Sequence, residues 1–228
     1  MEKEMKVLFV LSSHSRFDST GESTGWWLSE ASHPWKELQK ANIKVDFVSP
    51  KGGKAPVTGV DMSDTINKEF LADKIVQEQI VHTLTPDKIN IHDYVAIHFV
   101  GGHGACYDFP GNLALSQLAA DFYDNGKIVS AVCHGPSGLL NVKLWDGSFL
   151  LKDKKVTGFT DLEELEIKKV YDVPFLLQSE MMLRGGIFQL KPNWSDHVVI
   201  DGRLITGQNP QSARSLGREL VKMIQELK

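Results

Sequence analysis

Short runs of apolar residues recur along the chain, and each is followed by glycine, proline or another turn-forming residue. The runs are continuous rather than alternating, which is typical of strands buried on both faces of a parallel sheet. Strands are predicted at residues 7–11, 45–49, 94–100 and 127–132, with a weaker fifth at 155–159. Apolar residues at 198–200 and 204–206 flank Asp201-Gly202, which predicts a β-hairpin with a two-residue turn.

Between these runs, apolar residues recur at helical spacing and predict helices at 26–42, 65–83, 112–123 and 212–227. Pro34 should divide the first helix or open its second turn. Asn112 is suited to cap the third helix, and Asn125-Gly126 to end it. Segments 50–65 and 164–192 are excursions from the main sheet.

The alternation of strands and helices indicates an α/β fold with a doubly wound, mostly parallel sheet, helices on both faces and a β-hairpin in the C-terminal half. The chain has 228 residues, which favours a single domain. Apolar residues make up 42% and charged residues 24%, which excludes a mainly disordered chain.

The net charge limits which binding partners are expected, and the cysteine content limits which cellular compartment is expected. The net charge of −4 lacks the basic footprint of a nucleic-acid binder, so no nucleic-acid partner is predicted. Two cysteines, Cys106 and Cys133, are too few for a disulfide scaffold and favour a reduced chain. The first residues mix charges, and no apolar run approaches a signal core or a membrane span. A soluble cytoplasmic protein without a membrane partner is therefore expected.

The most informative stretch is Val132-Cys133-His134-Gly135-Pro136, where an apolar strand ends at a cysteine and a turn follows. A nucleophile at a sharp strand-to-helix turn projects from the carboxyl edge of the sheet. The N-terminus of the following helix would favour a thiolate. The alternative is a structural cysteine in a core strand, but the turn directly after Cys133 favours the functional interpretation.

The neighbouring strand ends in a similar way, at Gly101-Gly102-His103-Gly104. Glycines let the backbone approach a ligand closely, and their N–H groups can hold a developing oxyanion. Both turns should open on the crevice beyond the carboxyl ends of the strands.

These two motifs together resemble the ThiJ/PfpI superfamily, whose flavodoxin-like fold is shared with class I glutamine amidotransferases. Segments 24–34, 156–161 and 201–210 are similar to its heat-shock chaperone and glyoxalase III branch. The resemblance runs from the first predicted strand to the last helix, which implies one domain over residues 1–228.

The resemblance implies a role for each matching residue. Cys133 matches the family nucleophile, and His134 the histidine of its triad. Glu30 matches an acid beside the sulfur, so the two groups should share one proton, which the acid holds while the thiol is ionised. Glu164 falls where the branch places the acid that orients the histidine, with Glu163 as the alternative.

In the same way, Gly102 and His103 match the loop that receives a substrate oxygen together with the His134 N–H. The histidines match no zinc signature, and no metal is predicted. The residues at issue are His14, His33, His98 and His103.

The activity that the resemblance implies is a glutathione-independent glyoxalase (glyoxalase III, D-lactate dehydratase). It would convert methylglyoxal, or the smaller glyoxal, through a hemithioacetal on Cys133, with D-lactate as the product from methylglyoxal. The redox change is internal to the substrate, so no cofactor is predicted. Relatives also suggest a homodimer.

Other functions remain open at this stage. A holdase chaperone acting on unfolded proteins would need accessible apolar surface, for which Trp26, Trp27, Phe109 and residues 173–177 are candidates, although a core or dimer role is favoured for them. Repair of glycated proteins is a further possibility. A cysteine peptidase or an amidotransferase is less favoured, because the C-terminal part has Asn209-Pro210 where amidotransferases have a His-x-Glu pair.

Overall fold

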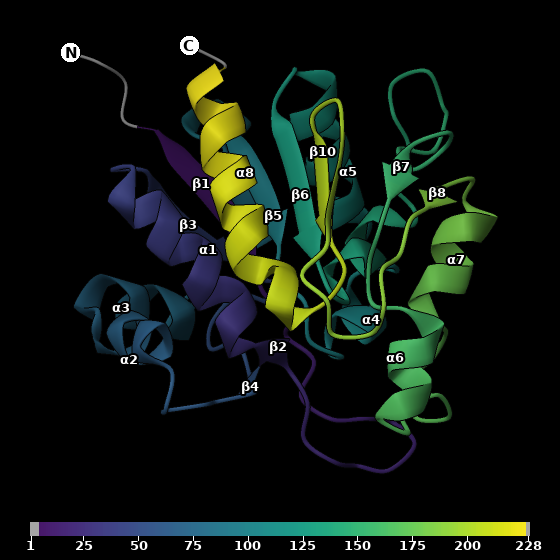
Figure 1. Cartoon of the computed structure of the whole chain (residues 1–228). Coiled ribbons are helices and arrows are strands. Elements are labelled where there is room, and N and C mark those ends of the chain that lie inside the picture. The colour runs from purple at the N-terminus through teal and green to yellow at the C-terminus, as the bar shows by residue number, and fades with distance from the viewer. Residues whose placement is uncertain (1–4, 227–228) are drawn as a thin grey trace.

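A six-stranded sheet forms the centre of the computed structural model, which describes residues 5–226 (Figure 1). The strands follow the order β3 (Lys44–Val48), β1 (Lys6–Val10), β5 (Ala96–Phe99), β6 (Ile128–Val132), β10 (Leu204–Gly207), β9 (Val198–Asp201). All neighbours are parallel except β10 and β9, which form the predicted hairpin around Gly202. The doubly wound α/β prediction is confirmed.

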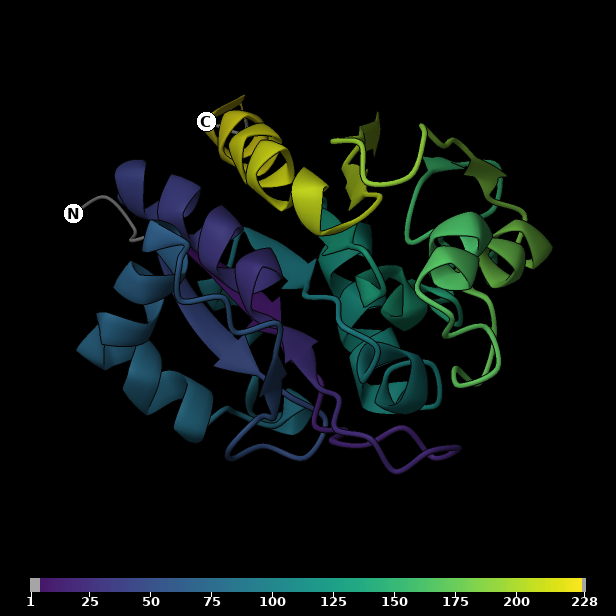
Figure 2. The same cartoon turned by 60° about the horizontal axis from the view of Figure 1, so that its bottom comes forward.

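Helices cover both faces of the sheet (Figures 1 and 2). α1 and α8 pack against each other on one face, and α5 lies on the other. The α-helices are α1 (Leu28–Lys40), α2 (Thr65–Ala72), α3 (Lys74–Val81), α4 (Ala105–Asp108), α5 (Leu113–Asp124), α6 (Asp161–Glu166), α7 (Leu177–Leu183) and α8 (Ala213–Glu226). Leu227, the predicted last residue of the C-terminal helix, lies outside the described residues. Within residues 5–226, no helix has the length and apolarity that a membrane span requires.

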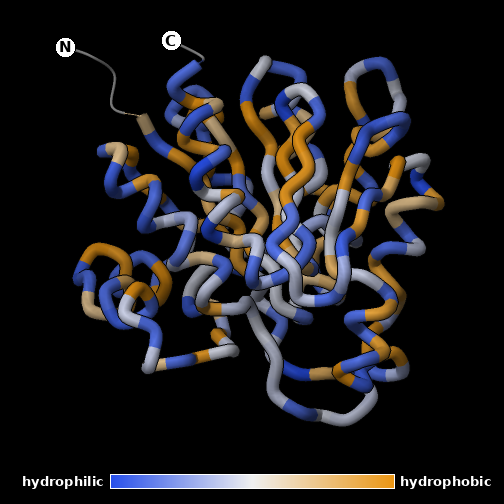
Figure 3. Tube along the Cα trace, in the orientation of Figure 1, coloured by the Kyte–Doolittle hydropathy of each residue, from blue (hydrophilic) through white to orange (hydrophobic). Residues whose placement is uncertain are grey.

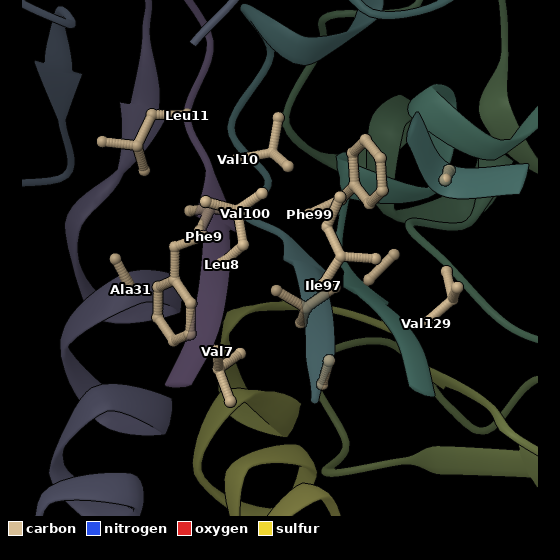
Figure 4. Close-up of a cluster of buried hydrophobic side chains, with 14 of the residues drawn as sticks. Val7, Leu8, Phe9, Val10, Leu11, Ala31, Ile97, Phe99, Val100 and Val129 are labelled. Atoms are coloured by element: carbon tan, nitrogen blue, oxygen red, sulfur yellow. The ribbon is translucent and has the colours of Figure 1, made fainter. Parts of the chain in front are cut away.

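The core explains why the central strands are continuous apolar runs. The hydropathy-coloured trace is most hydrophobic along these strands and mixed along the outer helices (Figure 3). Side chains from β1, β5 and α1 gather in one buried cluster, which includes Phe9, Ala31 and Ile97 (Figure 4). Burial on both faces leaves no polar positions for an alternating pattern.

Two sequence-based predictions about helices are wrong. The apolar periodicity of residues 65–83 suggested one helix, but the chain breaks at Asp73, whose extended backbone ends α2. The Asp73 carboxylate then caps α3 by accepting hydrogen bonds from the Ile75 and Val76 N–H groups. Pro34, in contrast, does not divide or open its helix, because α1 runs through it without interruption.

The predicted fifth strand is also different from expectation. Only β7 (Lys155–Val156) forms, and it pairs with β8 (Ile187–Phe188) in a separate two-stranded sheet. β2 (Trp26–Trp27) and β4 (Val57–Thr58) form a second small sheet beside α1. The remaining short elements are 3-10 helices: η1 (Pro86–Lys88), η2 (Ile91–Asp93), η3 (Gly135–Leu139) and η4 (Pro210–Ser212).

Candidate active site

Cys133 lies directly after β6 in a strained backbone conformation. Its φ of 58° is in the left-handed region, which costs a non-glycine residue about 1–2 kcal/mol. The turn closes over β5, because a Cβ at Gly135 would lie 2.2 Å from the carbonyl oxygen of Phe99. The predicted elbow is therefore present, but a 3-10 helix, η3, follows it instead of an α-helix.

Glu30 reaches the sulfur from the first turn of α1, and its side chain is completely buried. The approach requires glycine at position 101. A Cβ on Gly101 would lie 2.2 Å from Glu30 Oε2 and 2.9 Å from the Cys133 Cβ. Glu30 and Cys133, far apart in sequence, thus meet at the end of β5.

A second carboxylate approaches from the other side. Glu164 Oε2 accepts a hydrogen bond of 2.7 Å from His134 Nε2, and His134 Nδ1 lies 3.4 Å from Cys133 Sγ. Glu164 Oε1 accepts a second hydrogen bond, of 2.8 Å, from His103 Nε2. One carboxylate therefore holds two imidazoles, whose ring centroids are 4.1 Å apart.

Glu163 points away from this cluster into a network of its own. It completes a capping box with Thr160 at the start of α6, and it accepts hydrogen bonds from Gln208, Asn209 and the Trp194 backbone. Of the two candidates, Glu164 is the residue that contacts His134. The Thr160-x-x-Glu163 capping-box spacing is a sequence signal that would have separated them.

Burial and charge set the ionisation of these groups. Burial raises the pKa of Glu30, and the contacts with the Cys133 thiol and the Gly101 N–H lower it by smaller amounts, so that the pKa is about 8. Burial would also raise the pKa of Glu164, but His134 and the two imidazole hydrogen bonds lower it to about 2. Glu164 is thus an anion at neutral pH, while Glu30 holds a proton.

The pKa of Cys133 is raised well above its ordinary value by burial and by the neighbouring Glu30 carboxyl, which outweigh the lowering by the His134 N–H. This direction of the shift favours a resting thiol over the thiolate that the sequence predicts. The short η3 supplies no α-helix N-terminus, and Cys133 is only 3% exposed. A base must remove the thiol proton when a substrate arrives.

Five of the six residues singled out from the sequence line one cavity of about 110 Å³. The sixth, Glu164, lies behind the two histidines. The remaining walls are mostly aromatic or apolar and were not predicted. The full lining is Trp27, Glu30, Gly102, His103, Cys133, His134, Phe159, Ile167, Trp194 and Pro210. Trp194 lies in a loop at a positive φ of 63°, for which the sequence carries no signal.

His103, His134 and Glu164 could also hold a metal ion. One ligand atom from each lies within 4.8 Å of the others, although the spacing of these residues in the sequence matches no metal signature. The same atoms already satisfy one another through the two hydrogen bonds to Glu164, and that is the arrangement on which the chemistry below depends.

Glu30 should make the stability of the protein depend on pH. The folded carboxyl keeps its proton up to a pKa of about 8, whereas the unfolded one loses it near 4.5, so its contribution to stability is lost as pH rises through this window. The free energy of unfolding of Glu30→Gln, relative to the wild type, should increase by at most about 1.4 kcal/mol per pH unit between pH 5 and 8.

Urea denaturation of both proteins at several pH values in this window measures the difference. The variant minus wild-type comparison cancels the opposite contributions of the buried histidines. A difference that did not change with pH would contradict the proposed ionisation of Glu30.

The structure defines a class of α/β proteins that carry a cysteine on a strand-terminal elbow, flanked by a histidine and two buried carboxyls. Within that class, a family model described as DJ-1/PfpI matches residues 24–223. The chain belongs to the DJ-1/PfpI family.

Individual relatives are similar over nearly the whole chain. The glutathione-independent glyoxalase HSP31 of Saccharomyces cerevisiae is 36% identical, with 92% of this chain and 94% of the relative covered. The crystal structure of glyoxalase III from Candida albicans has a TM-score of 0.83 at 29% identity, with 96% of each chain covered. The X-ray structure of rapid encystment protein 24 kDa (REP24) from Francisella tularensis has a TM-score of 0.93 at 35% identity, with 96% of this chain and 99% of that chain covered.

Proposed function

We propose that this protein is a glutathione-independent glyoxalase that converts methylglyoxal to D-lactate. The observation that carries the proposal is a thiol 3.4 Å from an imidazole nitrogen and beside a buried, protonated carboxyl, in a cavity of about 110 Å³. The similarity to named glyoxalases over at least 92% of the chain supports the same activity.

The first step is activation of the thiol. Ionised Glu164 can only accept a hydrogen bond, so it holds the proton of neutral His134 on Nε2 and leaves the Nδ1 lone pair facing Cys133. His134 takes the thiol proton as sulfur bonds to the aldehyde carbon, and Glu30 gives its proton to the aldehyde oxygen. The product is a hemithioacetal.

The second step moves hydrogen between the two carbons. Glu30, now a carboxylate, removes the proton from the former aldehyde carbon, while protonated His134 gives a proton to the ketone oxygen, which forms an enediol. Glu30 then gives this proton to the former ketone carbon. At the same time, the hydroxyl group on the sulfur-bearing carbon gives its proton to His134. One carbon is oxidised and the other reduced, which yields a thioester without an external oxidant.

Water then hydrolyses the thioester, releases lactate and restores the thiol, so methylglyoxal and water together give the product. We assign backbone N–H groups of the Gly102–His103 loop and of His134 to binding of the substrate oxygen. The resemblance further predicts a homodimer, which light scattering coupled to size-exclusion chromatography would test.

The decisive assay is D-lactate formation from methylglyoxal without added glutathione. A panel with glyoxal, glutamine and a peptide separates the proposed activity from amidotransferase and peptidase activities. Turnover of glutamine or peptide without any lactate from methylglyoxal would overturn the proposal.

Exchanging Glu164 for glutamine should lower kcat by about 10²- to 10⁴-fold, because an amide no longer holds the required tautomer of His134. KM should change much less, since Glu164 lies behind the histidines and does not line the cavity. Steady-state kinetics measure both values, with Glu180→Gln on α7, which pairs with Arg184, as the control. A variant with wild-type kcat would remove Glu164 from the mechanism.

A holdase chaperone stays a second candidate because apolar side chains are exposed on α6 and α7, among them Leu162, Leu165 and Leu183. Of the surface named from the sequence, Trp26 and Phe109 are fully buried in the core, whereas Trp27 and most of residues 173–177 are partly exposed. Suppression of aggregation by a Cys133→Ala protein would separate holdase function from the chemistry and from repair of glycated proteins.

A further inference from the structure

Pro34 leaves a gap in the hydrogen bonding of α1 close to the active site. A helical residue normally donates its N–H to the carbonyl four positions earlier, and for position 34 that carbonyl belongs to Glu30. Proline has no N–H to donate, yet the helix continues through it. The backbone carbonyl of the active-site acid therefore lacks its usual helical donor.

His98 of β5 lies where that donor is missing. Its Nε2 is 3.4 Å from the Glu30 carbonyl oxygen, and its Nδ1 is 2.9 Å from Ser130 Oγ. His98 and Ser130 are register partners on the adjacent strands β5 and β6, and both are completely buried. The sheet thus carries a polar pair on the face that α1 covers.

The hydrogen-bond requirements select one tautomer of His98. If Nδ1 carried the proton, the lone pair of Nε2 would face the lone pairs of the Glu30 carbonyl in a place that water does not reach. If Nε2 carries it, His98 donates to the carbonyl. The Ser130 hydroxyl then donates to Nδ1 at 2.9 Å rather than to its other acceptor, the Ile97 carbonyl oxygen, at the longer distance of 3.3 Å. Every group in the chain from Ser130 to Glu30 then has a partner.

The Glu30 side chain itself has little to fix it. Neither carboxyl oxygen makes a hydrogen bond of regular geometry within the described residues. The carboxyl is held between Cys133 and Gly101 by the packing of its own helical turn. Its place beside the sulfur accordingly depends on where the backbone of residue 30 lies.

We propose that His98 is a positioning residue that anchors the Glu30 backbone carbonyl to the sheet and so keeps the Glu30 carboxyl beside Cys133. The inference rests on the proposed glyoxalase function for its kinetic consequences, but the anchoring itself can be measured without that activity. Pro34 makes the anchor necessary, since it removes the helix's own donor.

The test combines two substitutions. One removes the imidazole donor to the Glu30 carbonyl, and the other restores the backbone N–H donor of the helix. His98→Phe removes the anchor and should lower kcat by about 10- to 100-fold, with KM little changed, because the acid is misplaced by a fraction of an ångström. Pro34→Ala alone should stay close to the wild type. In the double variant, the backbone N–H restored at position 34 donates to the Glu30 carbonyl, and most of kcat should return.

Ser130→Ala gives a second route in case His98→Phe does not fold. It keeps the imidazole but removes the hydroxyl that holds the tautomer, and it should lower kcat by about 3- to 10-fold, again relieved by Pro34→Ala. Pro34→Ala can also stabilise α1 as a whole, so kcat is compared at a temperature at which urea denaturation shows every variant to be fully folded. Wild-type kcat in folded His98→Phe, or no recovery in the double variant, would overturn the proposal.

Two measurements are independent of glyoxalase activity. Nitrogen NMR of labelled histidine should show His98 with its proton on Nε2, and a proton on Nδ1 would overturn the anchor. The pH profile of iodoacetamide reaction with Cys133 should shift in His98→Phe and return in the double variant, because the neighbouring carboxyl moves. If the wild type lacked glyoxalase activity while these results held, the proposed function would fail and the anchor would stand.

Discussion

Cys133→Ala should lower the formation of D-lactate from methylglyoxal by at least about 10³-fold, since none of the other described residues that line the cavity carries a thiol or a hydroxyl group. The loss should appear in kcat, because sulfur forms the covalent bond on which every later step depends. The variant should fold, since a small apolar side chain replaces a buried thiol at the end of β6.

Cys106→Ala is the matched control. Cys106 is also buried, but it lies outside the cavity lining, and burial raises its pKa to about 12. We expect activity close to that of the wild type for this variant. If Cys133→Ala kept comparable activity, the covalent mechanism would be wrong.

Glu30→Gln should have the second largest effect, a loss of about 10²- to 10⁴-fold in kcat with retention of thiol chemistry. Glutamine occupies the same space beside Cys133 but cannot carry a proton between the substrate carbons. Addition of the thiol to the aldehyde should still occur, because His134 can take the thiol proton and pass it to the aldehyde oxygen in place of Glu30. Intact mass spectrometry after brief mixing with methylglyoxal should therefore show an adduct on the protein.

Glu37→Gln controls for a charge change on the same helix, as Glu37 pairs with Lys40 and Arg214 near the far end of α1. Its kcat should stay near the wild-type value. Normal turnover by Glu30→Gln would instead assign the proton transfer to His134 alone.

The sequence could predict the elements on which the site is built, because their signals are local. A buried parallel strand needs an apolar run, as at residues 128–132, and a hairpin of this type needs a residue such as Gly202 at its turn. The break at Asp73 was missed because the apolar periodicity continues across it. Only the capping hydrogen bonds reveal that two helices meet there.

Apart from the elbow at Cys133 and the glycine-rich turn at residues 101–104, the site was predictable only through resemblance, because its parts come from distant segments. Nothing near Glu30 in the sequence indicates full burial, which depends on the glycine at 101 and on the elbow at 133. The raised pKa of the Cys133 thiol could not be predicted for the same reason, since a motif carries no information about a carboxyl that folding places beside it. The position of Trp194 depends on the hydrogen bond from its backbone N–H to Glu163, a contact between a loop and helix α6.

The left-handed backbone at Cys133 has a consequence for laboratory evolution. A Cys133→Gly substitution would relieve the strain in that backbone. Selection for thermal stability alone should therefore favour variants that have lost the cysteine. Selection for survival in the presence of toxic aldehydes should retain Cys133, and any gain in stability would then have to come from substitutions at other positions. Sequencing the two populations and comparing the frequency of cysteine at position 133 would show how strongly stability and aldehyde removal oppose each other at this residue.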